Sequence, residues 1–140
     1  MSFRVLPAAE AHWRPSNQMG AQNTDLATQL QASTLAARMW RLAPGQASTR
    51  HRHETQTELY VVLEGTGRIR IDGELHTLDT LSSVLVEPAA IRQVFNDTGV
   101  DALWLVVGTP PELANTLQMT PEQLEWAYPD GTRALPPELA

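Results

Sequence analysis

The chain contains 140 residues with sixteen acidic and ten basic side chains, which gives a formal net charge of −6. All ten basic residues are arginines, and the absence of lysine and cysteine excludes lysine Schiff bases, disulfides, thiolate nucleophiles and cysteine-ligated metals. An acidic chain without a basic run is a poor partner for nucleic acid, and no apolar run approaches the about 20 residues that cross a bilayer.

Residues 1–33 are polar and are interrupted by Pro7, Pro15 and Gly20. A weak apolar pattern at Leu26 and Leu30 is compatible with a short helical turn, whereas the remainder favours an extended arm. The segment also lacks the apolar stretch of a secretory signal peptide. We therefore expect an N-terminal arm on a cytoplasmic protein that has neither a nucleic-acid nor a membrane partner.

Residues 34–108 are expected to form the core of the fold, because short runs of strand-forming residues alternate there with turn signals. Asp72-Gly73 is typical of a two-residue hairpin, whose tight turn requires positive φ. No segment between the runs has the length and pattern of a crossover helix, so the spacing favours an antiparallel sandwich or barrel over a parallel sheet. The expected strands are 35–42, 58–64, 67–71, 83–86, 91–95 and 102–107.

Residues 109–140 are rich in proline and are expected to form a short helix and a tail. Thr120, Pro121 and Gln123 match a helix start with a capping side chain, a proline at the first helical position and a glutamine at the third. The pattern predicts a helix from 121 to about 127, followed by an extended tail. No feature indicates a second domain, so residues 1–140 are interpreted as one.

The residues that point to chemistry are His51, His53 and Glu58. On a strand, side chains two residues apart project from the same face, so the two imidazoles would lie side by side. Glu58 follows closely enough to return beside them on the next strand. Two histidines and one carboxylate bind one side of a first-row divalent ion and leave positions open for water or substrate, which suits Zn, Ni, Fe or Mn.

The same residues fit a longer pattern, in which Gly45, His51, His53, Glu58 and Gly65 occupy the five positions of the first signature of the cupin superfamily. The sequence therefore resembles a small single-domain cupin over residues 34–108. The resemblance implies an all-β fold, an antiparallel jelly-roll barrel, with a metal site inside it. It also implies a homodimer, since small cupins usually pair.

The second cupin signature is incomplete in this chain. With Asn96 as the anchor, the position of the family's fourth ligand, a histidine, is occupied by Arg92; with Pro88 as the anchor, it is occupied by Gln93. An arginine stays protonated and cannot ligate a metal. Arg92 is then expected either to hold an anionic ligand that also coordinates the metal, or to pair with Glu58 in place of the metal. Gln93 would be a weak neutral ligand through its amide oxygen.

Two functions are compatible with this pattern. The first is a metal-dependent enzyme, of oxidoreductase or isomerase type, in which His51, His53 and Glu58 hold the ion and Arg92 or Gln93 contacts a small anionic organic molecule. The second is a non-catalytic module that binds a small molecule at a degenerate metal site. The missing fourth histidine gives weight to the second.

Overall fold

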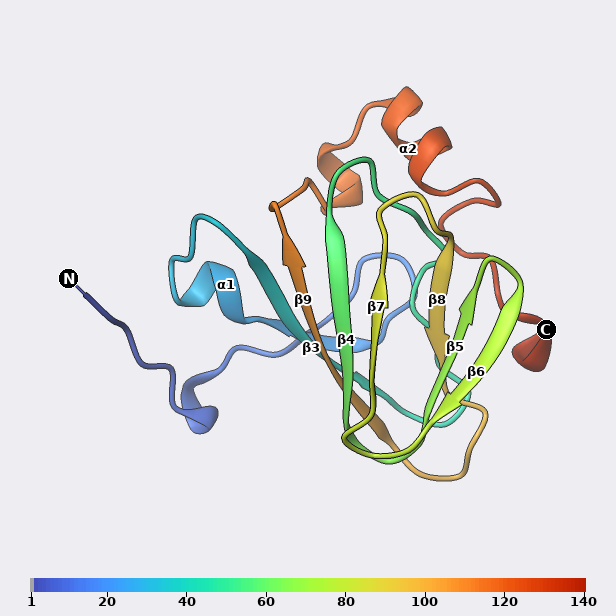
Figure 1. The fold of residues 1–140 in the computed structure, drawn as a ribbon, viewed down its shortest axis with the longest axis horizontal. Helices are drawn as coiled ribbons and strands as arrows, with labels where there is room; N and C mark the ends of the chain where they lie inside the picture. The colour runs from blue at the N-terminus through green and yellow to red at the C-terminus, as the bar shows by residue number, and fades with distance from the viewer. Residues whose placement is uncertain (1) are drawn as a thin grey trace.

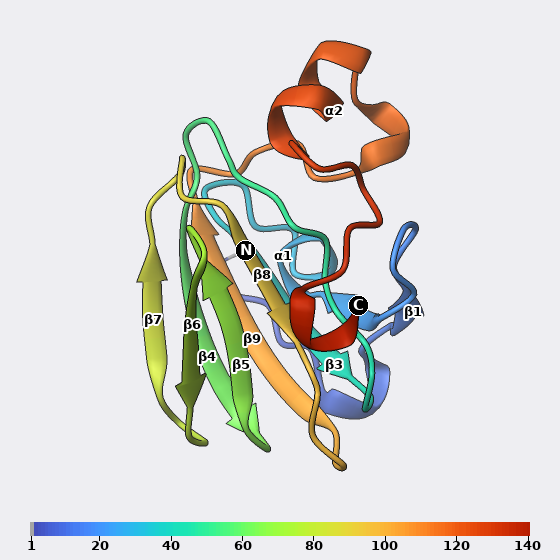
Figure 2. The same cartoon turned by 90° about the vertical axis from the view of Figure 1, so that its right-hand side faces the viewer.

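The computed structural model describes residues 2–140 and consists of two facing antiparallel sheets (Figures 1 and 2). In the six-stranded sheet the strands lie in the order β1 (Arg14–Pro15), β2 (Gln22–Asp25), β3 (Ala36–Leu42), β9 (Ala102–Thr109), β4 (Thr57–Glu64) and β7 (Ser83–Val86). In the three-stranded sheet the order is β6 (Glu74–Leu78), β5 (Gly67–Ile71) and β8 (Arg92–Phe95). The prediction of an all-β antiparallel jelly roll is confirmed. Across residues 2–140 the two sheets do not close into a continuous barrel, so that part of the expectation is corrected.

The core lies between the two sheets, where alternate strand residues point inward. Trp104, Val62, Ile69 and Val94 are all at most 3% exposed. Gly67 allows this close packing, because a Cβ atom there would lie 2.4 Å from a Val62 methyl carbon and 2.6 Å from the Trp104 ring. Any larger residue at this position would force the sheets apart.

The turn predicted at Asp72-Gly73 joins β5 to β6 as a hairpin, with Ile71 paired to Glu74. Both turn residues adopt positive φ, +47° for Asp72 and +84° for Gly73. This conformation is the one that a two-residue turn needs to match the twist of its strands. The strands predicted in residues 34–108 are all present, with ends that shift by one or two residues, and β6 completes the hairpin.

The expectation of an N-terminal arm is wrong for much of residues 1–33. β1 and β2 extend the six-stranded sheet beyond β3, and Asn23 and Thr24 of β2 are 1% and 0% exposed. Polar side chains are buried here because they are hydrogen-bonded to one another and to the chain. Asp25 then caps the short helix α1 (Leu26–Gln29) by accepting from the Thr28 amide, which is the helical turn that the sequence left open.

The C-terminal helix α2 (Pro121–Ala127) begins with the predicted capping box, in which the Thr120 and Gln123 side chains each bond to the other's backbone amide. With the 3₁₀ turn Thr116–Gln118 it lies over one end of the sandwich (Figures 1 and 2). The tail beyond it is bound to the fold, because Glu138 in the turn Pro137–Leu139 pairs with Arg70 of β5. A further 3₁₀ turn spans Ala8–Glu10. Among residues 2–140, no helix has both the length and the apolar character needed to cross a bilayer.

Candidate metal centre

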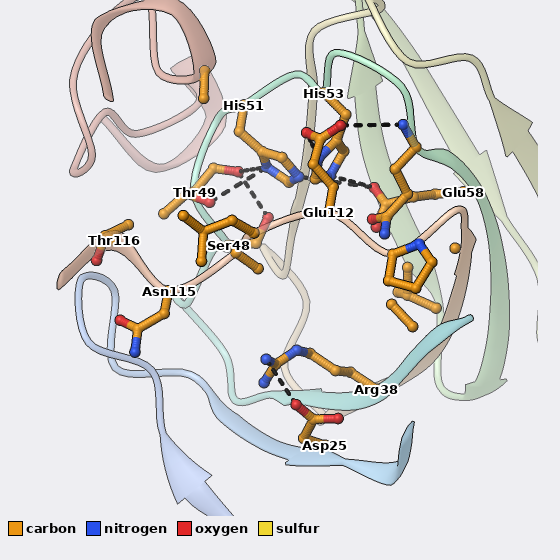
Figure 3. A pocket seen from close by; sticks show the side chains of 18 of the residues that line it. Asp25, Arg38, Ser48, Thr49, His51, His53, Glu58, Glu112, Asn115 and Thr116 are labelled. Carbon is orange, nitrogen blue, oxygen red and sulfur yellow. Dashed lines mark hydrogen bonds and ion pairs between the residues drawn. The ribbon is translucent and has the colours of Figure 1, made fainter. Parts of the chain in front are cut away.

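The segment between β3 and β4 brings His51 and His53 beside Glu58, which points inward from β4 (Figure 3). A backbone bridge to Arg92 holds His51, and the His53 amide donates to the Pro88 carbonyl at 2.8 Å. One nitrogen of each imidazole and one carboxylate oxygen all lie within 4.8 Å of one another. The predicted convergence of these three side chains is therefore present in the structure.

Hydrogen bonds on the far side of each imidazole determine which nitrogen faces the cluster. Nδ1 of His51 lies 3.0 Å from the Thr49 carbonyl, and Nδ1 of His53 lies 2.9 Å from a carboxylate oxygen of Glu112. Both partners accept hydrogen bonds, so each neutral ring carries its proton on Nδ1. The Nε2 lone pairs are then directed toward Glu58, at 3.8 Å for His51 and 3.2 Å for His53.

This arrangement fits a divalent metal ion. His53 Nε2 is buried without a hydrogen-bond partner, although a carboxylate oxygen is close by. A buried polar atom without a partner lowers the stability of the folded protein, and a cation between the lone pairs would provide that partner. The three groups, two imidazole nitrogens and a carboxylate, are ligands that Zn, Ni, Fe and Mn accept, so the cluster could hold such an ion.

The electrostatics of the cluster also favour a bound positive charge. Burial acts to raise the pKa of Glu58, but His51 and His53 outweigh it and hold that pKa well below its ordinary value. Burial likewise acts to lower the pKa of His53, whereas Glu58 and Glu112 raise it above the ordinary value. The site therefore attracts either a proton or a metal ion, and the two compete for the same lone pair.

Arg92 lies next to the cluster, but its guanidinium does not face the cavity. The side chain is 1% exposed, and its terminal nitrogens donate to the carbonyls of Glu87 at 2.8 Å and Pro88 at 3.3 Å. Its Nε lies 3.8 Å from Glu58 and has no hydrogen-bond partner. Of the two roles open to Arg92 in the sequence, this geometry is nearer to the pairing with Glu58 than to contact with a ligand.

Gln93 points to the opposite side of β8 from Arg92, as alternation along a strand requires. Its amide nitrogen donates to the carbonyls of Ser48 and Ala134, each at 2.8 Å, so the side chain connects the core to the C-terminal tail. It is absent from the lining of the cavity that the three ligands face. Gln93 therefore does not reach the cluster, whereas Arg92 lies directly beside it.

A cavity of about 510 Å³ opens from the cluster toward β2, β3 and the C-terminal segment. Arg38 of β3 faces it across from the histidines and Glu58 (Figure 3), with Asp25 at 3.0 Å and Asn23 at 2.8 Å holding its guanidinium.

Sequence reasoning missed both Arg38 and Glu112. Arg38 shares the inward face of β3 with Trp40 and Leu42, so strand alternation would have found it. Glu112 gave no signal, because it lies in a proline-rich stretch outside the strands.

Comparisons with known proteins place this fold among the cupins. The profile of the cupin domain family matches residues 38–108. A sugar phosphate isomerase of the cupin superfamily from Silicibacter pomeroyi has 26% sequence identity and a TM-score of 0.70, over 77% of this chain and 76% of that one. A cupin protein from Bacteroides fragilis has 20% identity and a TM-score of 0.66, over 96% and 99% of the two chains. A predicted oxalate decarboxylase from Thermotoga maritima has 19% identity and a TM-score of 0.65, over 77% and 100%.

A search of curated protein sequences gave no match. The family profile nevertheless spans half of the chain and contains the ligand-bearing segment and most strands of both sheets. The chain therefore belongs to the cupin family.

Proposed function

We propose that the protein is a metal-dependent enzyme, of isomerase or oxidoreductase type, that acts on a small anionic organic molecule. The observation that carries this proposal is the convergence of the His51 and His53 Nε2 atoms and the Glu58 carboxylate at one end of an internal cavity. These three side chains would hold a divalent ion, Zn, Ni, Fe or Mn. Bound there, the ion would polarise a substrate carbonyl or hydroxyl as a Lewis acid.

The remaining cavity residues support an anionic substrate of sugar-like size. A volume of about 510 Å³ lies within the range of small-molecule sites. Arg38 would bind the anionic group, since its planar guanidinium has donors left beyond those used by Asp25 and Asn23. A substrate with vicinal oxygens at one end and a phosphate or carboxylate at the other would bridge the two ends. The sugar phosphate isomerase from Silicibacter pomeroyi, at 26% identity, makes phosphorylated sugars the first class to test.

The chain itself would orient the substrate and limit its access to water. Asn115 and Thr116 of the C-terminal segment and Gln18 of the N-terminal segment line the cavity, and the Gln18 amide donates to the Thr116 hydroxyl at 3.1 Å. The two segments thus meet at the cavity wall. A substrate held behind them would have fewer competing water molecules around its reacting carbons.

A second function, non-catalytic binding of a small molecule, is favoured by Arg92. A buried cation 3.8 Å from Glu58 would repel a dication held by that carboxylate and would weaken its binding. In that case the same cavity would bind its anionic ligand without turnover.

The deciding experiment is to strip the purified protein of metal, reload it separately with Zn, Ni, Fe and Mn, and measure stoichiometry by elemental analysis. The loaded protein is then incubated with phosphorylated sugars and small carboxylic acids, and the products are followed by NMR. About one equivalent of metal together with turnover supports the enzyme. Ligand binding without turnover supports the binding module, and failure to retain any of the four metals would overturn the metal site.

The homodimer and the cytoplasmic location stay predictions. Leu59 and Leu85, which pair across β4 and β7 on the outer face of the six-stranded sheet, are 40% and 60% exposed. A second copy packed on this face would remove them from water. Light scattering on the full chain is expected to give twice the mass of one chain, and Leu85→Glu is expected to reduce it to a single mass.

A further inference from the structure

Glu112 lies outside the region that the cupin profile matches, four residues beyond its end, yet it reaches back to the metal-ligand segment. It stands between β9 and α2 and lines the same cavity as His53 and Glu58 (Figure 3). Neither cupin signature contains a residue with this position. Its role must therefore be inferred from its contacts.

Both carboxylate oxygens of Glu112 accept hydrogen bonds from the loop that carries His53. Oε1 accepts from the Thr55 amide at 2.8 Å, the Thr55 hydroxyl at 2.9 Å and the Gln56 amide at 3.3 Å. Oε2 accepts from the Glu54 amide at 3.2 Å and lies 2.9 Å from His53 Nδ1. Five contacts from residues 53–56 therefore hold this carboxylate against the loop that carries His53.

A carboxylate oxygen 2.9 Å from Nδ1 has two consequences for the imidazole. It keeps the proton on Nδ1, which leaves Nε2 free to ligate, and it makes Nε2 a stronger electron-pair donor. The amide bonds from Glu54 to Gln56 fix the carboxylate in place, so the orientation of His53 does not depend on a mobile side chain. His51 has a neutral backbone carbonyl at the equivalent nitrogen and lacks this charge.

We propose that Glu112 is a positioning residue of the metal centre, which fixes the tautomer and orientation of His53 and makes the C-terminal segment part of the site. This inference rests on the proposed function, because it concerns the ligand that His53 would provide. It predicts that the cupin domain alone, as defined by residues 38–108, holds only part of the determinants of metal affinity.

The test uses the full-length chain, with Zn as the probe. Zn affinity is measured by competition with a chromophoric chelator for the wild type, Glu112→Gln and the control Glu125→Gln. Glu125 carries an exposed carboxylate on α2, in the same C-terminal segment as Glu112, and does not line the cavity. Glu112→Gln is expected to weaken Zn binding by about 10- to 100-fold, as loss of an orienting partner typically does. Glu125→Gln is expected to leave it unchanged.

A second readout separates positioning from a merely structural role. The ¹⁵N shifts of the His53 imidazole are measured without metal at alkaline pH, where histidines are neutral. The wild type is expected to show the proton on Nδ1, and Glu112→Gln a mixture of tautomers. Zn affinity within twofold of wild type with an unchanged tautomer would overturn the proposal. If Glu112→Gln fails to fold, Glu112→Asp, which keeps the charge and shortens the side chain, is expected to give an intermediate loss.

The two proposals can fail separately. A wild-type chain that binds no metal would overturn the proposed function, and the tautomer of His53 in the metal-free protein would still decide whether Glu112 controls it. A chain that binds Zn equally well with and without Glu112, and keeps the same His53 tautomer, would overturn the positioning role alone.

Discussion

The two signature regions of this cupin domain handle buried charge in opposite ways. In the first, His51, His53 and Glu58 bring two lone pairs and a negative charge together at the edge of a cavity. In the second, Arg92 places a positive charge beside them, but backbone carbonyls hold its guanidinium. The first region is thus electrostatically incomplete without a cation, whereas the second is largely satisfied by the protein itself. The comparison shows that a fixed, buried positive charge lies beside the three converging side chains.

That difference has a chemical consequence. A metal held by three protein ligands has more open positions than one held by four, and the adjacent guanidinium partly offsets the charge of Glu58. The net charge at a loaded site is therefore more positive than in a site with a fourth histidine, which is neutral. A loaded site of this kind would attract an anionic ligand more strongly and would hold its metal less tightly.

Glu58→Gln is expected to have the largest effect, because it removes the only negative charge among the three ligands. Glutamine has nearly the same shape, so the loss reports on charge rather than on packing. Zn affinity, measured by chelator competition, should fall by more than about 100-fold. Glu87→Gln is the matched control, since Glu87 is exposed and, within residues 2–140, its carboxylate accepts a hydrogen bond from the Thr57 hydroxyl alone, at 3.4 Å. An equal loss in both variants would contradict a specific role for Glu58.

Arg92→Met is expected to affect stability and metal affinity in opposite directions. The carbonyls of Glu87 and Pro88 lose their donor and Glu58 loses its partner, so stability should fall by about 3 kcal/mol in urea unfolding. Zn affinity should rise by about tenfold, because a like charge leaves the neighbourhood of the ion.

Arg92→His extends this test, because an imidazole at this position restores the histidine of the family's second signature. Zn affinity in this variant should exceed that of Arg92→Met. Weaker Zn binding in both variants would show instead that the guanidinium supports the cluster, and the contrast between the two regions would fail.

Arg38→Gln tests the other end of the cavity and is expected to have a smaller effect. Binding of a phosphorylated sugar to the Zn-loaded protein should weaken by about tenfold, because a charge-assisted hydrogen bond is lost. Zn affinity itself should not change. Arg41→Gln is the control on the same strand, since Arg41 pairs with Glu64 and Asp101 outside the cavity. Isothermal titration with both variants provides the measurement, and equal losses would remove Arg38 from the anion site.

The sequence predicted the parts of this molecule that depend on local pattern. Alternation and turn residues located the strands β3, β4, β5, β7, β8 and β9, the Asp72-Gly73 turn implied β6, and the capping box at Thr120 located α2. The spacing of His51 and His53 identified the cluster, because side chains two residues apart on an extended segment lie on the same face. In each case the determining interactions are local or follow a fixed period.

The parts that were missed depend on contacts between distant segments. The sequence of β2 did not resemble a strand, because its buried residues are polar. Burial of Asn23 and Thr24 is stable only because Asn23 accepts a hydrogen bond from Arg38 and Thr24 accepts one from Gln29. Glu112 stands 59 residues from His53 along the chain, and nothing near it in sequence indicates that contact. Burial of polar groups is stable only when their partners are in place, and the sequence does not show those partners side by side.

Tyr60→Phe is expected to have the smallest effect, because the Tyr60 hydroxyl lies next to the three converging side chains but is not one of them. The Tyr60 hydroxyl donates to Glu58 Oε1 at 2.9 Å, while its ring packs against Trp104 and stays in place in the variant. Removing one hydrogen bond to a carboxylate that keeps other partners should cost about 1 kcal/mol of stability and about fivefold in Zn affinity. Urea unfolding and chelator competition measure the two effects. A loss as large as that of Glu58→Gln would mean that the carboxylate depends on Tyr60 for its orientation, and the cluster would then have to include the hydroxyl as a fourth essential group.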